Sequence, residues 1–447
     1  MPHFLDLFLH EIQENRDTLR RRLTGEEFTS LDGLLKNAFQ KEWRDLPADT
    51  KPDLQVIAVD SGRSTQEYAP GSFMYICRAS AITSWGTTHR QISSNVHMIS
   101  SPREQLIDLA SIRSEHIEHK VALEAVREAS EVDMLLIDGS LYGRITHVPI
   151  GFNYPGERDL YLRYLETFMQ LLEECRKRKI LLLGISKDSV ARHMTRLLLD
   201  SLKTEILTDL SPALSNHELD QLTQLLDTEE KQSLSARSIL KALPISSDQY
   251  DLVWNLLSEL RRPRPDFSLI HAWTETAGYT TPIEPYPAVP LFKYESKDPA
   301  AYVRRRFASA YNDYEREEDF EKWAIPVMKE FFQIPTFVTF CTKLRYNDTP
   351  LRIDMPAFNI GLPTRLSQIN SSRLLDPPPS RVTDVLGNLQ GQYGGLELYN
   401  VYLVKADQQA RLPMQDVRTL YEPLIEKELK IPLTPKRRDR RIRLAKI

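Results

Sequence analysis

The chain has 447 residues, a formal net charge of −4 and 41% hydrophobic residues. Its length allows about three domains or one elaborated core, and its composition is that of a globular protein, which excludes a disordered chain. No apolar run reaches the roughly 18 residues that a membrane span needs. Glu11, Glu14 and Asp17 interrupt the apolar positions near the N-terminus, which excludes a signal peptide.

The three cysteines, Cys77, Cys175 and Cys341, are too few and too widely spaced for a disulfide framework or a zinc site. We therefore expect buried, reduced thiols in a cytoplasmic protein. The slightly acidic net charge provides no general basic surface for nucleic acid, so any contact with DNA must come from a local groove.

Residues 1–50 are predicted to form an N-terminal helical segment. Leu5, Phe8 and Leu9 recur at helical spacing with charged residues between them. We expect the apolar surface that they form with Phe4 to be a docking surface for a partner protein.

The pattern of short apolar runs and longer amphipathic stretches predicts a mixed α/β core over residues 51–204. Three strands joined by short turns form an antiparallel meander, and helices then cross over to parallel strands. The predicted elements are strands 54–60, 72–85 and 91–99, helix 102–130, strand 134–138, helix 159–179 and strand 180–185.

The remainder of the chain departs from this alternation. Residues 205–262 are polar and helix-rich and are followed by a proline-dense stretch, so we interpret residues 205–290 as an inserted helical module and connector. Residues 291–430 are predicted to complete the core, and residues 431–447 form a basic tail. The strands predicted in this last part are 291–294, 336–346, 351–354 and 396–403, with a helix from there to about residue 429.

Two of the predicted strands end in a carboxylate followed by small residues. Asp60 closes the first strand before Ser61 and Gly62, and Asp138 closes the fourth before a Gly-Ser pair. One such pair usually marks only a turn. Two in equivalent positions predict acidic side chains that leave the same edge of the sheet.

The helix between these strands provides a third acid. Projected at 100° per residue, its apolar positions cluster on one face. Glu124 falls in the middle of that face and Glu128 close by, whereas Glu115 and Glu118 fall to the side. Because a core-facing carboxylate is costly unless it is paired or bound to metal, Glu124 is the predicted third ligand. The alternatives are that Glu124 lies past the buried part of the stripe, or that it pairs with Arg113 or Lys120.

Three carboxylates at one sheet edge repel each other unless divalent cations bind between them. Two ions about 4 Å apart can activate water and stabilise the departing oxygen of a phosphodiester. An Asp on the first strand, a Glu on the first crossover helix and an Asp on the fourth strand are the arrangement of the ribonuclease H-like fold.

The motifs in this order resemble the NurA nuclease family. The resemblance implies a manganese-dependent nuclease (or one using magnesium) with 5′ to 3′ exonuclease and single-strand endonuclease activity on DNA. It also implies a toroidal homodimer and a HerA-type hexameric ATPase as partner. The matching segments are AVDSG (58–62), LEAVREA (123–129), LLIDGSL (135–141), GISKDS (184–189) and RIDMP (352–356).

By this resemblance, Asp60, Glu124 and Asp138 are metal ligands. For the fourth ligand, the family carries a His in a late segment. Here LVKADQQARL (403–412) has Asp407 at that position. A carboxylate suits Mn²⁺ or Mg²⁺, so we favour Asp407, with Asp354 as the rival and a helix-capping role for Asp407 as the alternative.

Several further residues are candidates for contacts near the same site. Lys187 and Asp188 follow the next parallel strand, and Lys187 is predicted to contact a DNA phosphate. Arg352 and Asp354 share one face of a strand, where they either form an ion pair or line the DNA groove. Asp188, Asp354 and Glu128 are predicted to support the metal ligands.

Arg304 and Arg305 are predicted to track DNA phosphates, with a solvated helix face as the alternative. The sequence contains no phosphate-binding loop of the type G-x-x-x-x-G-K-[ST], so a separate motor protein must power the separation of long strands.

Two other classes of function stay open at this point. One is a ribonuclease H-like scaffold that binds nucleic acid or a partner with little or no cleavage. The other is a sugar- or acetate-kinase-like phosphotransferase, which needs a second glycine-rich phosphate loop that the sixteen glycines do not form.

Overall fold

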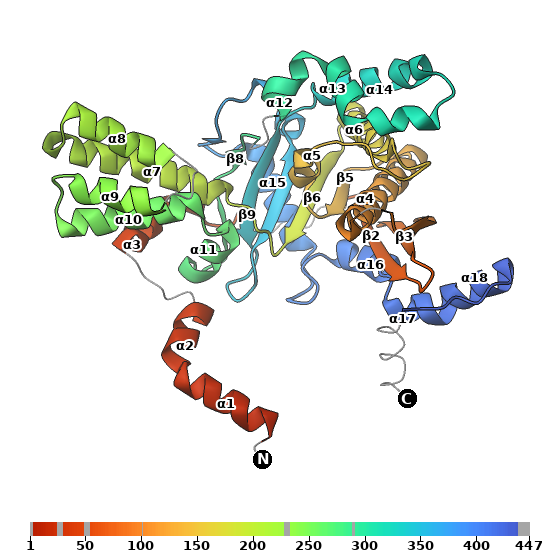
Figure 1. The fold of residues 1–447 in the computed structure, drawn as a ribbon, viewed down its shortest axis with the longest axis horizontal. Coiled ribbons are helices and arrows are strands. Elements are labelled where there is room, and N and C mark those ends of the chain that lie inside the picture. Colours follow the sequence, from red (N-terminus) through yellow and green to blue (C-terminus); the bar gives the residue numbers. More distant parts are fainter. Residues whose placement is uncertain are drawn as a thin grey trace.

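One mixed β-sheet runs through the molecule, with helices on both of its faces (Figure 1). The computed structural model describes residues 3–24, 30–48, 54–100, 102–227, 233–287 and 291–436. These residues form an 11-stranded sheet, nine strands of which lie side by side in the order β1-β7-β9-β10-β6-β5-β2-β3-β4.

The half of the sheet from β6 to β4 contains the predicted core. β2, β3 and β4 pair antiparallel, whereas β5 pairs parallel with β2, and β6 with β5. The predicted ribonuclease H-like α/β fold is therefore confirmed. Its elements are β2 (Val56–Glu67), β3 (Ser72–Thr83), β4 (Thr88–Met98), α4 (Arg103–Glu128), β5 (Met134–Asp138), α5 (Leu141–Thr146), α6 (Leu160–Arg178) and β6 (Leu181–Lys187).

The other half extends this sheet with antiparallel strands. β10 pairs with β6 and β9, β7 continues the sheet to β1, and β8 and β11 branch from β9. These strands are β1 (Trp43–Arg44), β7 (Gly278–Thr280), β8 (Ile283–Glu284), β9 (Phe337–Lys343), β10 (Leu351–Pro356) and β11 (Arg373–Leu374).

Both faces of the sheet are covered, which explains the continuous apolar runs of its central strands. Ile57 and Val59 of β2 pack into the core beneath α4 and α6. Val56 and Ala58, which alternate with them, pack into the core on the opposite side. That second core is closed by α15 (Ser380–Gly391) and α16 (Val401–Ala410).

The inserted helices form a lobe with an apolar core of their own, drawn at the left of Figure 1. The lobe begins at residue 193, earlier than predicted, and α3 from the N-terminal segment packs against it. Asp266 ties the lobe together, because its carboxylate accepts hydrogen bonds from the first turn of α7. The helices are α3 (Ser30–Lys41), α7 (His193–Leu210), α8 (Asn216–Asp227), α9 (Ser233–Ala242), α10 (Ser247–Arg261) and α11 (Asp266–Trp273).

Two predicted strands are wrong. Residues 291–294 form the short helix α12 (Leu291–Tyr294), whose Phe292 packs against Phe331 with ring centroids 5.2 Å apart. Residues 396–403 contain the start of α16, because the Asn400 side chain accepts from the amides of the next turn and caps the helix. A four-residue apolar run does not distinguish helix from strand by its periodicity.

The remaining helices lie at the periphery. α13 and α14 pack near α6, and α17 and α18 extend from α16 beside β3 (Figure 1). The predicted basic tail lies mostly outside the described residues, from residue 437 onward. These helices are α13 (Pro299–Arg306), α14 (Glu317–Phe331), α17 (Met414–Asp416), a π-helical turn over Val417–Tyr421 and α18 (Glu422–Leu429).

The N-terminal helices α1 (Phe4–Glu14) and α2 (Arg16–Thr24) extend away from the body in Figure 1. No residue of α1 is buried, and Phe4, Leu5 and Phe8 are all exposed. Among the described helices, none has the length and apolarity to cross a membrane.

Candidate metal centre

Asp60 and Asp138 lie on neighbouring parallel strands. Val59 pairs with Ile137 in the register of β2 and β5, so the two acids follow at the same level of the sheet. Asp138 ends β5 as predicted, but Asp60 does not end β2, which continues to Glu67 along β3. The two acids therefore lie at the point where β5 ends beside the longer strand β2.

A close helix approach brings a third acid from far along the chain. The C-terminal end of α16 lies directly on β2 at Gly62, where an added Cβ would stand 2.3 Å from the Ala410 carbonyl oxygen. The Arg78 Nε donates to the same carbonyl at 2.9 Å. Glycine at position 62 is what permits this contact, and with it the approach of Asp407 to Asp60.

The fourth acid is Glu118 of α4, which the sequence analysis assigned to the side of the helix. It is 2% exposed. The Ser61 hydroxyl donates to its Oε2 at 2.7 Å, and the Arg144 Nη2 donates to its Oε1 at 2.9 Å. Burial raises the pKa of Glu118, while Arg144 and Ser61 lower it.

The pKa of Asp60 reflects its burial and the acidic side chains around it. Its pKa is raised from 3.8 to about 8, first by burial and then by the charges of Glu118, Asp138 and Asp407. A hydrogen bond from the Ser61 amide opposes the shift without cancelling it. The three other acids are thus close enough to repel Asp60, as expected where cations bind between carboxylates, but no three of these four described residues present oxygen atoms that all lie within 4.8 Å of one another.

Lys187 and Tyr399 border this acid group. The Lys187 Nζ lies 2.8 Å from the Asp138 Oδ2, and the Tyr399 hydroxyl donates to the same oxygen at 3.2 Å. The ammonium also lies over the Tyr399 ring, 4.8 Å from its centroid. Burial would lower the pKa of Lys187, but Asp138, Asp60 and Asp407 outweigh it and raise the pKa.

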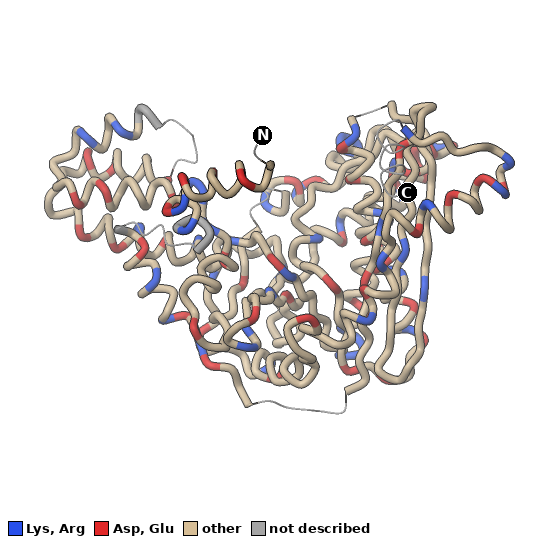
Figure 2. Tube along the Cα trace, turned by 90° about the horizontal axis from the view of Figure 1, so that it is seen from below, with Lys and Arg blue, Asp and Glu red and all other residues tan. Residues whose placement is uncertain are grey.

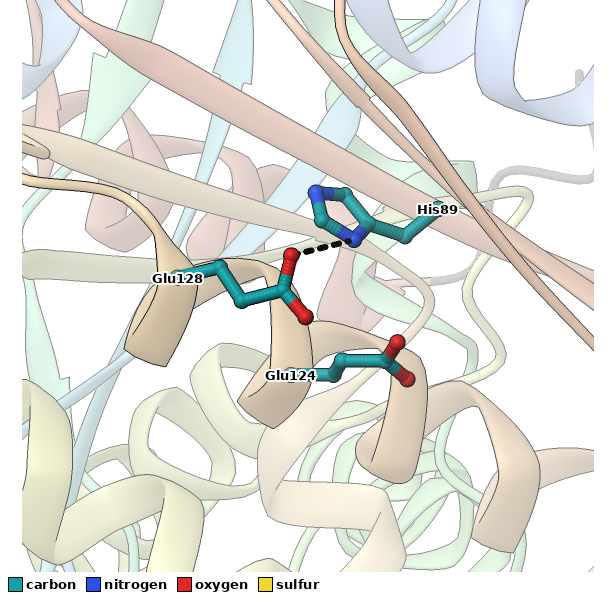
Figure 3. A group of neighbouring side chains, drawn as sticks. All are labelled: His89, Glu124 and Glu128. Atoms are coloured by element: carbon teal, nitrogen blue, oxygen red, sulfur yellow. Dashed lines mark ion pairs between the residues drawn. The ribbon is translucent and has the colours of Figure 1, made fainter.

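The structure does not bring Glu124 to this group, and the prediction that it faces the core is wrong. Its side chain is exposed and accepts a hydrogen bond from Gln91 of β4 at 2.8 Å. Figure 3 shows it beside Glu128, whose Oε2 lies 3.6 Å from the His89 Nδ1. These three residues offer ligand atoms within 4.8 Å of one another, but they are partly or fully exposed.

Arg352 and Asp354 form the ion pair that the sequence left as one alternative. The Arg352 Nε lies 2.9 Å from the Asp354 Oδ1, and both side chains are buried. Arg352 is thus enclosed rather than exposed on a groove. The second oxygen of Asp354 accepts from the Ser140 hydroxyl, so the structure brings Asp407, and not Asp354, to Asp60.

The other predicted contact residues lie apart from the acids. Arg304 and Arg305 are exposed on α13 and pair with Glu321 and Glu295, at the end of the sheet that Figure 1 draws opposite α16. Asp188 follows Lys187 as an exposed residue in a left-handed conformation, with φ of 49°. Figure 2 shows basic and acidic residues interspersed, in keeping with the absence of a general basic surface.

The donor set fits a hard divalent cation. Carboxylate oxygens are the ligands that Mn²⁺ and Mg²⁺ prefer, and the pKa of Asp60 is raised by burial and then by neighbours of its own charge. The sequence predicts Asp60, Asp138 and Asp407 for this centre, but it did not indicate Glu118 or Tyr399. A ribonuclease H-like sheet with carboxylates at this edge defines the class of the protein.

Comparison with known proteins gives the family. The family model of the NurA domain matches residues 54–412, so the chain belongs to the NurA family. The three cysteines are free and buried, as expected. No curated protein matches the chain in sequence.

Solved structures agree with this fold. The NurA nuclease from Sulfolobus solfataricus is 14% identical, with a TM-score of 0.53, over 96% of this chain and 98% of that one. A NurA structure bound to dAMP and manganese is also 14% identical, over 93% and 97% of the two chains, with a TM-score of 0.42. At this identity the first likeness supports the fold alone.

Proposed function

We propose that this protein is a two-metal-ion deoxyribonuclease whose ions are held by Asp60, Glu118, Asp138 and Asp407. The observation that carries the proposal is the placement of these acids around Asp60: the register of β2 and β5 sets Asp138 at the level of Asp60, and the Ser61 hydroxyl next to Asp60 donates to Glu118. Burial and then the other three acids raise the pKa of Asp60 to about 8. Among the described residues, Lys187 and Arg144 form ion pairs with these acids. Their two positive charges do not balance the four negative charges of the ionised carboxylates. Divalent cations supply the missing positive charge.

Mn²⁺ or Mg²⁺ at this centre would activate a water and stabilise the oxygen that leaves the phosphodiester. The protein contributes the geometry. Ser61 and Arg144 orient the Glu118 carboxylate, and Tyr399 orients that of Asp138. Lys187, half-exposed beside Asp138, provides an ammonium for a phosphate oxygen of the DNA.

The first test is a cleavage assay on end-labelled linear DNA with and without Mn²⁺. We expect cleavage by the wild-type chain only with the metal, and none by Asp60→Asn. Binding of DNA without cleavage under all metal conditions would favour the scaffold function instead. Substrates labelled at the 5′ or 3′ end, and a circular single strand, test the proposed 5′ to 3′ exonuclease and single-strand endonuclease activities.

A HerA-type hexameric ATPase as partner and a homodimer are parts of the same proposal. They rest on the family and on surfaces that the chain exposes. α1 exposes Phe4, Leu5 and Phe8, and the edge strand β4 exposes Ile92 and Val96. Apolar surface at a free sheet edge favours association with another chain.

Light scattering on the purified chain tests the dimer, and co-purification with a HerA-type ATPase tests the partner. If α1 is the docking helix, the double substitution Phe8→Asp with Leu9→Asp abolishes the complex without changing cleavage of short single strands. An intact complex would shift the docking proposal to the helical lobe. DNA-end processing in repair is the cellular context we propose for this activity.

A further inference from the structure

The turn that follows Asp138 is held by a residue outside the metal centre. Gly139 has φ of 104°, and Ser140 then caps the short helix α5 by accepting from the Gly143 amide at 2.7 Å. The Ser140 hydroxyl donates to the Asp354 Oδ2 at 2.5 Å. The Tyr142 amide donates to the same oxygen at 3.2 Å. One carboxylate oxygen on β10 therefore binds both the N-cap residue and the second residue of α5.

Asp354 itself is fully buried and held from the other side. Its Oδ1 accepts from the Arg352 Nε at 2.9 Å, and this Nε also lies 3.0 Å from the Thr339 Oγ1. The ion pair with Arg352 balances the charge of Asp354. Its second oxygen, Oδ2, accepts the hydrogen bonds from Ser140 and Tyr142 in the turn. A buried acid that is neutralised and bonded in this way is suited to hold backbone rather than a metal ion.

The far end of α5 reaches the metal centre. Arg144 donates to the Glu118 Oε1 at 2.9 Å and to the Asp138 carbonyl oxygen at 3.2 Å. The helix α5 thus connects Asp354 at its start with two of the four acids near its end. A shift of the turn would move both acids together.

We propose that Asp354 is a positioning residue for the metal centre and acts through Ser140 and α5 on Asp138 and Glu118. This inference rests on the proposed nuclease function. The positions of metal-binding carboxylates must be fixed to within about half an ångström for catalysis. This requires neighbouring residues that are themselves held by packing and hydrogen bonds. Asp354 fixes the position of this turn without contacting metal or DNA.

The test compares Asp354→Asn and Ser140→Ala in the full-length chain. Both should lower kcat, Asp354→Asn about tenfold or more and Ser140→Ala severalfold, and both should raise the Mn²⁺ concentration at half-maximal rate. The KM for DNA should stay within twofold, because no DNA contact is changed. The double variant should be no slower than Asp354→Asn alone, since both act through one link.

Thr339→Val is the matched control, because it removes a hydrogen bond to Arg352 in the same buried network but leaves the α5 turn untouched. We expect it to lower the melting temperature without changing kcat or the Mn²⁺ requirement. All rates are measured well below the melting temperatures of the variants. If Asp354→Asn and Ser140→Ala lower only the melting temperature, as Thr339→Val does, the inference is overturned.

The wild-type chain and Asp60→Asn are assayed in parallel. A wild-type chain that does not cleave DNA with Mn²⁺ contradicts the proposed function itself. Cleavage by the wild-type chain together with wild-type kcat in Asp354→Asn contradicts the positioning role alone. Additive losses in the double variant also contradict it, because they separate Asp354 from Ser140.

Discussion

One helix, α4, carries two acidic groups that differ in kind. Glu118 is buried between Ser61 and Arg144, and its negative charge helps to raise the pKa of Asp60. Glu124 lies further along the helix, is exposed, and has Gln91 and the group of His89 and Glu128 around it. Both groups contain enough oxygen ligands for a cation.

The comparison shows that the number of carboxylates does not identify a metal centre. At the buried group, loss of hydration and mutual repulsion raise the pKa of Asp60 to about 8, a cost that bound cations relieve. At the exposed group, Glu124 accepts a hydrogen bond from Gln91, Glu128 lies beside His89, and exposure to solvent avoids the cost of burial. The feature that indicates a metal centre here is the burial of carboxylates without enough positive charge nearby, rather than the number of acidic residues.

The largest effect is expected from neutralising the buried group. Asp60→Asn and Asp138→Asn should each lower cleavage by about 10³-fold or more, roughly 4 kcal/mol of barrier, because each removes a carboxylate that would hold the proposed metal ions. The measurement is the initial rate on labelled linear DNA, with DNA binding and circular dichroism as checks of folding. A rate within tenfold of wild type for either variant would refute the assigned centre.

The sharpest comparison is between the two glutamates of α4. Glu118→Gln should lower kcat by about 10²-fold, since a ligand is lost, whereas Glu124→Gln should stay within twofold. Thermal melts identify any loss of folding in Glu118→Gln, which leaves Arg144 without its ion-pair partner. The reverse ranking of the two variants would restore Glu124 as the ligand.

A smaller effect is expected from Asp407, which approaches from a separate helix. Asp407→Asn should raise the Mn²⁺ concentration at half-maximal rate about tenfold, or about 1.4 kcal/mol of metal affinity. Glu128→Gln, a change of the same type in the exposed group, is the control and should leave the titration unchanged. An unchanged titration in Asp407→Asn would remove this residue from the centre.

A separate prediction concerns stability without metal. The pKa of Asp60 is about 8 in the folded chain and near 3.8 in the unfolded chain, so the folded state keeps a proton that the unfolded state has lost. Stability from this group is therefore present below about pH 4 and is lost as the pH rises through 8.

Urea unfolding in EDTA at pH 6 and pH 9 measures this dependence. Asp60→Asn should stabilise the chain more at pH 9 than at pH 6, whereas Glu124→Gln should follow the wild type at both. Equal stabilisation at the two pH values would contradict the assigned pKa.

The sequence was sufficient for the first half of the fold because its signals are local. Apolar runs that end in Asp60 and Asp138, separated by one long helical pattern, specify a meander, a crossover and a parallel strand. The same reasoning failed at residues 291–294 and 396–403, where short apolar runs fit a helix as well as a strand.

The choice of Glu124 over Glu118 failed because α4 is buried on more than one face. A helical projection assumes a single apolar stripe, but α4 packs on β2 and β3 and also on α6. Comparing lengths along the strand and the helix points to Glu118 instead. Asp138 lies about 13 Å from the start of β5, and about nine residues of α-helix span the same length. Counting nine residues back from Glu128, where α4 ends before β5 begins, reaches the position next to Glu118.

The sequence by itself therefore determined the order of the core strands and the two acids that end their apolar runs, because both depend on neighbours in the chain. Only the tertiary structure decided that Glu118 and Tyr399 join them, and that Asp407, which the family resemblance indicated, approaches Asp60. Their approach depends on two buried helix faces and on the space above Gly62, where the carbonyl oxygen of Ala410 leaves no room for a side chain. Such contacts depend on packing between distant segments, which no local pattern records.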